Sequence, residues 1–243
     1  MIEVVDYHKT YRDLTAVSGL TFEVRRGAIL GLCGPNGAGK TTTLRALAGI
    51  IPPTRGKLIV AGHDIVADAI AAKRQLAYVP DDPKLFDTLT VWEHFEFIAS
   101  AYRVGDFASK AAGFLELFEL SEKRDTITQE LSRGMRQKVA IACAYLHDPQ
   151  AILFDEPLTG LDPRGIRTLK KSIVARAATG AAIIISSHLL SLVEDLCSDL
   201  LILQRGRALF CGPIGQARER FGSLGQEASL EEVFFRAIDG QAS

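Results

Sequence analysis

A short stretch near the start of the chain constrains its fold more than any other feature of the sequence. It consists of Gly34, Pro35, Asn36, Gly37, Ala38, Gly39, Lys40, Thr41 and Thr42. The apolar run at 28–32 before it predicts a buried strand, and residues 42–48 after it predict the first turns of a helix. A glycine-rich loop that connects a strand to a helix and ends in Lys-Thr matches the phosphate-binding loop. The pattern therefore predicts an α/β fold built around a nucleoside triphosphate site.

Each residue type in this loop has a physical task. Glycines let the backbone turn tightly, so that several N–H groups converge on phosphate oxygens. The N-terminus of the following helix adds partial positive charge. We expect Lys40 to reach the β- and γ-phosphates and the Thr41 hydroxyl to ligate Mg²⁺. The loop predicts that a nucleotide binds, but not what the energy of its hydrolysis is used for.

The composition excludes other classes of protein. The formal net charge of −1 produces no overall field that would recruit nucleic acid, so no nucleic-acid partner is expected. Residues 1–6 do not resemble a signal peptide, and no apolar run reaches roughly 18 residues, so we expect no membrane span. Three of the four cysteines sit inside apolar runs, which favours reduced, buried thiols in a cytosolic protein. The cysteines are Cys33, Cys143, Cys197 and Cys211.

Alternating apolar and polar residues distinguish one part of the chain from the rest. Residues 2–7 and 20–25 alternate in this way, and residues 57–61 form another short strand pattern. Such alternation is typical of antiparallel strands with one face buried. It predicts an antiparallel β part made of residues 1–27 and 57–62.

Short apolar runs without alternation mark the centre of a parallel sheet. Residues 151–154 and 182–185 form such runs, and helical patterns at 163–178 and 189–197 follow them. Residues 200–210 are predicted to form a hairpin. The fold class is therefore α/β, a P-loop core with a mostly parallel sheet.

The segment between these strands has a different pattern. Apolar residues recur at helical spacing through residues 88–145, with no clear strand. This predicts a helical subdomain at about 84–147, inserted into the core. Residues 230–238 form a short amphipathic helix pattern, and we expect residues 1–243 to make one domain.

A second chemical pattern follows the apolar run at 151–154. Asp155 and Glu156 stand at the end of that predicted strand, where side chains face the ligand crevice of an α/β sheet. The Asp155 carboxylate suits Mg²⁺, and Glu156 is placed to take a proton from the attacking water. An acidic pair alone is weak evidence for a catalytic role, because turns often begin with acidic residues. The phosphate loop upstream favours the functional interpretation.

A third pattern supports a family resemblance. Ser132, Arg133, Gly134 and Met135 precede an apolar-periodic helix, with Ser132 where an N-cap belongs. By itself this sequence describes an ordinary capped helix. In order after the phosphate loop and before Asp155 and Glu156, it resembles the signature sequence of the ATP-binding cassette (ABC) ATPases.

The resemblance covers nearly the whole chain and implies roles for further residues. It implies that two cassettes pair head-to-tail, so that Ser132 and the Gly134 N–H contact the γ-phosphate bound by the other copy. It also implies that Asp162 belongs to a loop crossing the dimer interface. By the same resemblance, His188 contacts the γ-phosphate and Tyr11 stacks on adenine.

Two positions depart from the family pattern. Asp81 stands where the family usually has Gln, and Arg133 where it usually has Gly. The Asp81 carboxylate is a candidate Mg²⁺ ligand, although its place at the insert boundary favours a role in transmitting motion. The pattern Ser-basic-Gly-Met-basic-Gln favours the exporter branch called ABC-2 type.

The resemblance implies an ATP-hydrolysing, nucleotide-binding subunit of a membrane exporter. Glu156, His188 and Lys40 would be its catalytic residues, with ATP and Mg²⁺ bound. The expected partners are a separate transmembrane permease subunit and a second ATPase subunit, in a homodimer or heterodimer. The expected location is cytoplasmic, peripheral on the inner face of the cell membrane. The alternatives are a soluble ABC ATPase acting on ribosomes or DNA, and another P-loop enzyme such as a GTPase or kinase. The sequence contains no Asn-Lys-x-Asp guanine motif.

Overall fold

The computed structural model describes residues 1–222 and 229–239, and its strands form two sheets. The strands are β1 (Ile2–Tyr11), β2 (Leu14–Val24), β3 (Ile29–Cys33), β4 (Arg55–Val60), β5 (His63–Asp64), β6 (Leu76–Val79), β7 (Ala151–Asp155), β8 (Ala182–Ser186), β9 (Asp199–Gln204) and β10 (Arg207–Pro213). The helices are α1 (Lys40–Leu47), α2 (Ala69–Arg74), α3 (Val91–Tyr102), α4 (Phe107–Leu117), α5 (Arg133–Tyr145), α6 (Pro163–Ala178), α7 (Leu190–Leu196), α8 (Ile214–Phe221) and α9 (Leu230–Asp239). The expectation of one domain over 1–243 extends beyond the described residues.

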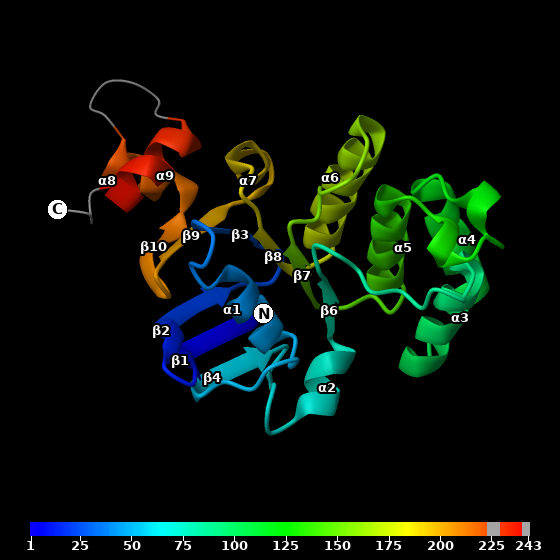
Figure 1. The fold of residues 1–243 in the computed structure, drawn as a ribbon, viewed down its shortest axis with the longest axis horizontal. Coiled ribbons are helices and arrows are strands. Elements are labelled where there is room, and N and C mark those ends of the chain that lie inside the picture. The colour runs from blue at the N-terminus through cyan, green and yellow to red at the C-terminus, as the bar shows by residue number, and fades with distance from the viewer. Residues whose placement is uncertain (223–228, 240–243) are drawn as a thin grey trace.

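The larger sheet has the order β10-β9-β3-β8-β7-β6, and every pair in it except β10–β9 is parallel. All residues of β3, β7 and β8 are buried, because helices or the second sheet cover both faces (Figure 1). Alternate side chains of β8 divide between the faces. Ile183 and Ile185 join the cluster beneath α5 and α6, whereas Ile184 joins the cluster beneath α1.

The smaller sheet has the order β2-β1-β4-β5 and packs through α1 against the larger one. Its strands are longer than the alternation at 2–7 and 20–25 predicted. The missed residues follow the predicted stretch in β1 and precede it in β2. In β1 the next buried position is the polar Lys9, and in β2 the register shifts between Leu20 and Val17, where Gly19 takes a positive φ of 69°. A bulge of this kind displaces the period of two on which the prediction depends.

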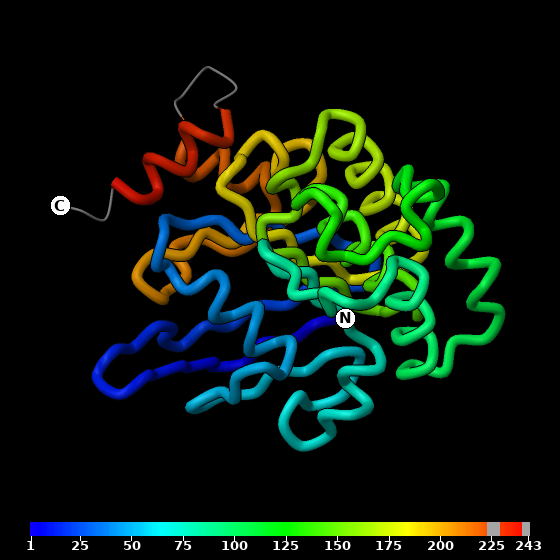
Figure 2. Tube along the Cα trace, turned by 45° about the vertical axis from the view of Figure 1, so that its right-hand side comes forward, coloured from blue at the N-terminus to red at the C-terminus, as the bar shows by residue number. Residues whose placement is uncertain are grey.

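Helices α3, α4 and α5 form the insert beyond the β6 edge of the larger sheet (Figures 1 and 2). A capping box begins α3, in which the Thr90 hydroxyl accepts from the Glu93 N–H and the Glu93 carboxylate accepts from the Thr90 N–H. The insert shares a core with the helix-covered face of the sheet, centred on Phe95, Phe118 and Tyr145. Its α5 therefore connects the insert to the strands.

The C-terminal hairpin β9–β10 packs under α7, α8 and α9 in a third cluster. The pattern of apolar residues in the sequence did not predict α8. All four thiols are free, and Cys33 and Cys143 are buried, but Cys211 is exposed. The Cys211 side chain is exposed because β10 is an edge strand, where alternate side chains point to solvent. No helix within the described residues is long and apolar enough to cross a membrane.

The insert offers a matched pair for testing this packing. Phe95 is fully buried, whereas Phe97 on the same helix is 48% exposed. Phe95→Ala should lower the free energy of unfolding by about 3–5 kcal/mol because it leaves a cavity. Phe97→Ala loses mainly an edge contact with Phe86, worth about 1 kcal/mol. Urea denaturation measures both, and equal losses would contradict the assigned core.

Candidate active site

The phosphate loop joins β3 to α1, and two of its glycines are required by space. A Cβ at Gly34 would lie 2.4 Å from the Leu203 carbonyl oxygen. At Gly39, where φ is 105°, a Cβ would lie 2.9 Å from the Ala16 carbonyl oxygen. The loop therefore passes between β2 and β9 with no room for side chains at these positions.

Lys40, the first residue of α1, folds its ammonium back over the loop. The Nζ atom donates to the Gly34 carbonyl oxygen at 2.7 Å and to that of Pro35 at 3.3 Å. Lys40 is 9% exposed, and both of these partners are neutral. Its positive charge is thus held inside the loop and remains available to an anionic ligand.

A cavity of about 490 Å³ lies on one side of this loop. It is lined by Tyr11, Leu14, Thr15, Ala16, Asn36, Gly37, Ala38, Gly39, Lys40, Thr41, Thr42 and Arg205. The cavity therefore brings Tyr11 to the phosphate loop, as a ring that stacks on adenine requires. The ring of Tyr11 is partly exposed, and the Lys9 ammonium lies 4.8 Å from its centroid.

Arg205 in this cavity was not predicted from the sequence. It occupies the tight turn between β9 and β10, which hydrogen bonds fix beside the loop. The Gly206 N–H donates to the Ala38 carbonyl at 3.0 Å, and the Ser18 N–H donates to the Gly206 carbonyl at 2.8 Å. The Arg-Gly pair in the sequence indicated the turn, but nothing local indicated what the turn contacts.

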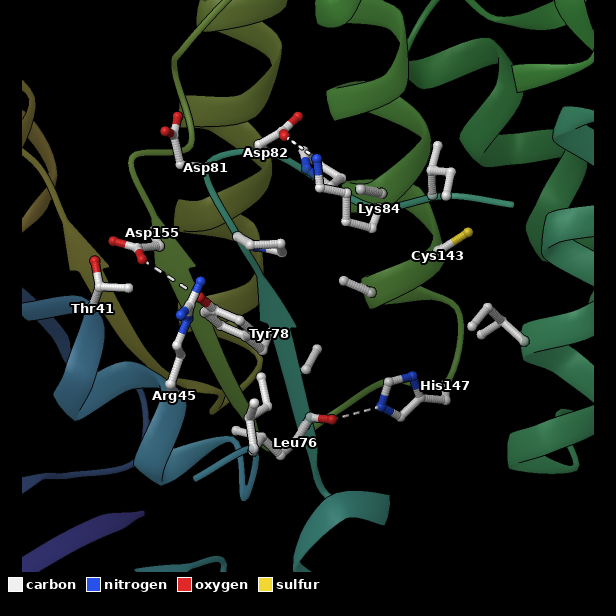
Figure 3. A pocket seen from close by; sticks show the side chains of 18 of the residues that line it. Thr41, Arg45, Leu76, Tyr78, Asp81, Asp82, Lys84, Cys143, His147 and Asp155 are labelled. Carbon is white, nitrogen blue, oxygen red and sulfur yellow. Dashed lines mark hydrogen bonds and ion pairs between the residues drawn. The ribbon is translucent and has the colours of Figure 1, made fainter. Parts of the chain in front are cut away.

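A second cavity, of about 720 Å³, begins at the other side of Thr41 (Figure 3). Asp155 lines it and is 4% exposed, and its Oδ2 atom accepts from the Tyr78 hydroxyl at 3.4 Å. Burial and the neighbouring Asp155 charge raise the pKa of Tyr78 to about 12, so the phenol stays a donor.

The donors at this edge fit a magnesium ion that is shared with a nucleotide. Thr41 and Asp155 line the same cavity and supply a hydroxyl and a carboxylate. Among residues 1–222 and 229–239, no cluster of three His, Cys, Asp or Glu residues could hold a metal alone. Mg²⁺ in nucleotide sites uses one or two protein oxygens together with phosphate oxygens and water, so two donors are sufficient.

Glu156 forms a compact polar group with the segment that follows β8. Its Oε2 atom lies 2.8 Å from the Nδ1 atom of His188 and accepts from the Ser187 hydroxyl at 3.3 Å. The Glu156 backbone takes a positive φ of 50°, and its N–H donates to the Ser186 carbonyl. Such a conformation costs on the order of 1 kcal/mol, so neighbouring contacts must maintain it. The sequence predicted Glu156 and His188 separately, but it did not indicate that Ser187, directly before His188, would hydrogen-bond to Glu156.

Asp81 lies on the rim of the second cavity, as the position after β6 implies. Its Oδ1 atom is 3.1 Å from the Nη2 atom of Arg133, and the two side chains form an ion pair. The close-up places Asp81 above Asp155 (Figure 3). Its role as a metal ligand stays a prediction, because the carboxylate already has a charged partner.

The signature residues lie outside both cavities. The Ser132 hydroxyl caps α5 by accepting from the Met135 N–H at 3.2 Å. Gly134 packs so closely that a Cβ there would be 2.3 Å from the Gly160 carbonyl oxygen. Asp162 caps α6, and hydrogen bonding by the Gly165 N–H lowers the pKa of its carboxyl. Within the described chain, neither cavity at the phosphate loop is lined by Ser132, Gly134 or Asp162.

Known proteins with similar sequences and structures agree with this geometry. The family model described as ABC transporter matches residues 17–159. The chain is 31% identical over 236 residues to the ABC-type transporter ATP-binding protein EcsA of Bacillus subtilis, covering 96% of this chain and 95% of that protein. It is 35% identical over 214 residues to the Nod factor export ATP-binding protein I of Ralstonia nicotianae, covering 87% of this chain and 67% of that protein. A solved ATP-binding subunit of an ABC transporter superposes with a TM-score of 0.92 at 34% identity, covering 98% of this chain and 99% of that one. These similarities confirm the predicted P-loop fold class.

Two substitutions test how the nucleotide is held. Lys40→Ala removes the charge aimed at the phosphates, so ATP affinity or turnover should collapse. Tyr11→Ala should weaken binding by roughly 1–2 kcal/mol, the value of base–aromatic stacking. Titration with a fluorescent nucleotide ranks the variants, with exposed Phe97→Ala in the insert, which lines neither cavity, as the control. Unchanged affinity in Tyr11→Ala would remove Tyr11 from the site.

A third substitution tests the acidic group. Glu156→Gln keeps the size of the side chain but removes its basicity, so turnover should fall by about 10²-fold or more. ATP binding should persist, because the loop and Lys40 are unchanged. Phosphate release and nucleotide titration measure the two quantities, with exposed Glu116→Gln as the matched control. Turnover near that of the parent would refute Glu156 as the general base.

Proposed function

This chain belongs to the ABC transporter family of ATP-binding proteins, and from that premise we propose that it powers a membrane exporter. It is an ATPase of that family. The observation that carries the assignment of the hydrolytic site is the Glu156–His188 contact of 2.8 Å beside the buried Asp155. A base, a polar partner for the γ-phosphate and a metal-binding carboxylate therefore leave adjacent strands at the edge where the phosphate loop begins.

Each residue has a distinct task in hydrolysis. Lys40 and the loop N–H groups bind the phosphates, and Tyr11 orients the adenine by stacking. Thr41 and Asp155 hold Mg²⁺, which offsets phosphate charge when bound. Glu156 accepts a proton from the attacking water at its carboxylate, while its contact with His188 orients the imidazole towards the γ-phosphate.

Two copies are needed to complete the site. Ser132 and Asp162 are exposed, and neither lines a cavity at the phosphate loop within the described part of the chain. In a head-to-tail pair they face the nucleotide of the other copy, where the Ser132 hydroxyl and the Gly134 N–H contact its γ-phosphate. The same arrangement serves a homodimer or a heterodimer of ATPase subunits.

The membrane partner is a separate permease subunit. The cavity of about 720 Å³ is lined by Asp155 and by the apolar Ile98, Tyr102 and Cys143, between β6 and the insert. Figure 3 shows Asp155 and Cys143 on its opposite sides. We assign the apolar side to a cytoplasmic helix of the permease, which would place the chain on the inner face of the membrane. Similarity to a Nod factor export protein supports the outward direction.

Dimerisation can be tested with the hydrolysis-deficient variant. Glu156→Gln should form dimers in ATP and Mg²⁺, because bound nucleotide joins the two surfaces and is not consumed. Adding Lys40→Ala should abolish those dimers. Light scattering after size-exclusion chromatography gives the mass directly. A parent Glu156→Gln protein that stays monomeric at saturating ATP would contradict the head-to-tail arrangement.

The permease assignment needs native membranes. The tagged chain, purified in detergent, should bring down an integral membrane protein identified by mass spectrometry. Ile98→Asp places a charge in the apolar side of the cavity and should abolish recovery of the membrane protein, whereas Ile70→Asp, at an exposed position of α2, should not. Thermal melting checks that both variants fold. If the unmodified chain recovers only ribosomal or DNA-bound proteins, the soluble alternative holds.

A further inference from the structure

The two departures from the family pattern meet each other in space. Arg133 and Asp81 are far apart in sequence, yet their Nη2 and Oδ1 atoms are 3.1 Å apart. Both side chains are 49% exposed. Exposed ion pairs typically contribute only about 0–1 kcal/mol to stability, so this contact is not needed to hold the fold. Its importance lies in which segments it connects.

Arg133 connects three segments of the site. It is the first residue of α5 and lies between Ser132 and Gly134. Its aliphatic stem covers Gly160, where a Cβ would lie 3.2 Å from Cγ and 3.3 Å from Cδ of the arginine. Its guanidinium then reaches Asp81 in the loop that leaves β6. Arg133 therefore contacts the loop after Glu156 and the rim of the metal-binding edge simultaneously.

Asp81 is the carboxylate that forms an ion pair with Arg133, although the charges of Arg133 and Arg136 also act on the adjacent Asp82. The adjacent Asp82 pairs with Lys84, which lowers the pKa of the Asp82 carboxyl. Arg136, one turn along α5, donates to the Leu131 carbonyl oxygen at 2.6 Å. Within the described residues, the Asp81 carboxylate and the Arg133 guanidinium thus form one pair of opposite charges.

We propose that Asp81 and Arg133 are paired positioning residues that couple the loop after β6 to the signature segment. A displacement of that loop beside this chain's own nucleotide then moves Ser132 and Gly134, which serve the nucleotide of the second copy. Asp81 acts through Arg133 and is not a resident Mg²⁺ ligand. The inference rests on the proposed function, because it requires the signature to complete a site in another copy.

The test uses a charge reversal within the Glu156→Gln background. Asp81→Arg and Arg133→Asp should each weaken ATP-dependent dimerisation by about five- to tenfold, which lies within the range of coupling between residues in direct contact. The double variant, with the pair reversed, should recover to within about twofold of the parent. The matched control is another ion pair at the surface, the partly exposed Lys170 with Asp195 at 2.7 Å, where Lys170→Asp and Asp195→Lys should each leave ATP-dependent dimerisation unchanged.

A magnesium titration separates positioning from metal binding. Asp81→Asn and Arg133→Gln should have equal effects on dimerisation and leave its dependence on Mg²⁺ concentration unchanged. Single variants that dimerise like the parent, or a reversed pair that is not rescued, would overturn the proposal. So would a raised Mg²⁺ requirement in Asp81→Asn alone, which would make Asp81 a ligand. Failure of the Glu156→Gln parent to dimerise is a different result, because it contradicts the proposed function itself.

Discussion

The parallel register of β3, β8, β7 and β6 is the constraint on which the rest of the site depends. Parallel strands place all their carboxyl ends at one edge, and the functional segments follow those ends directly. Asp155 pairs with Ser186 across β7 and β8, so strand pairing brings the segments that carry Glu156 and His188 together. A slip of one residue would exchange the two faces of these fully buried strands and bury the wrong side chains.

Close backbone packing fixes the loops that leave this edge. Gly34 and Gly39 lie against carbonyl oxygens of β9 and β2, and Gly134 lies against that of Gly160. Glu156 holds a positive φ within the same set of contacts. Among these positions only Glu156 carries backbone strain, and the hydrogen bond from its N–H to the Ser186 carbonyl oxygen holds it at the sheet edge.

The sequence predicted the parts of the site that are local. The phosphate loop, Asp155 and Glu156 are short patterns directly attached to buried strands, and the structure brings them to one edge. The pairing of Asp81 with Arg133 and the approach of Arg205 were not predictable, because each depends on contacts between segments distant in the chain. The full extent of β1 and β2 was missed for another reason, since the buried Lys9 in β1 and a register shift at Gly19 in β2 interrupt the alternation of apolar and polar residues.

The central claim is that this sheet edge makes half of each hydrolytic site and that a second copy completes it. Mixing two inactive variants tests it most directly. Lys40→Ala has no functional phosphate loop, and Ser132→Arg has no functional signature, so each should be inactive alone. In a mixed dimer the intact loop of one chain meets the intact signature of the other, and ATP hydrolysis should return on mixing. A mixture as inactive as its components, or a Ser132→Arg protein that hydrolyses ATP normally, would contradict the account.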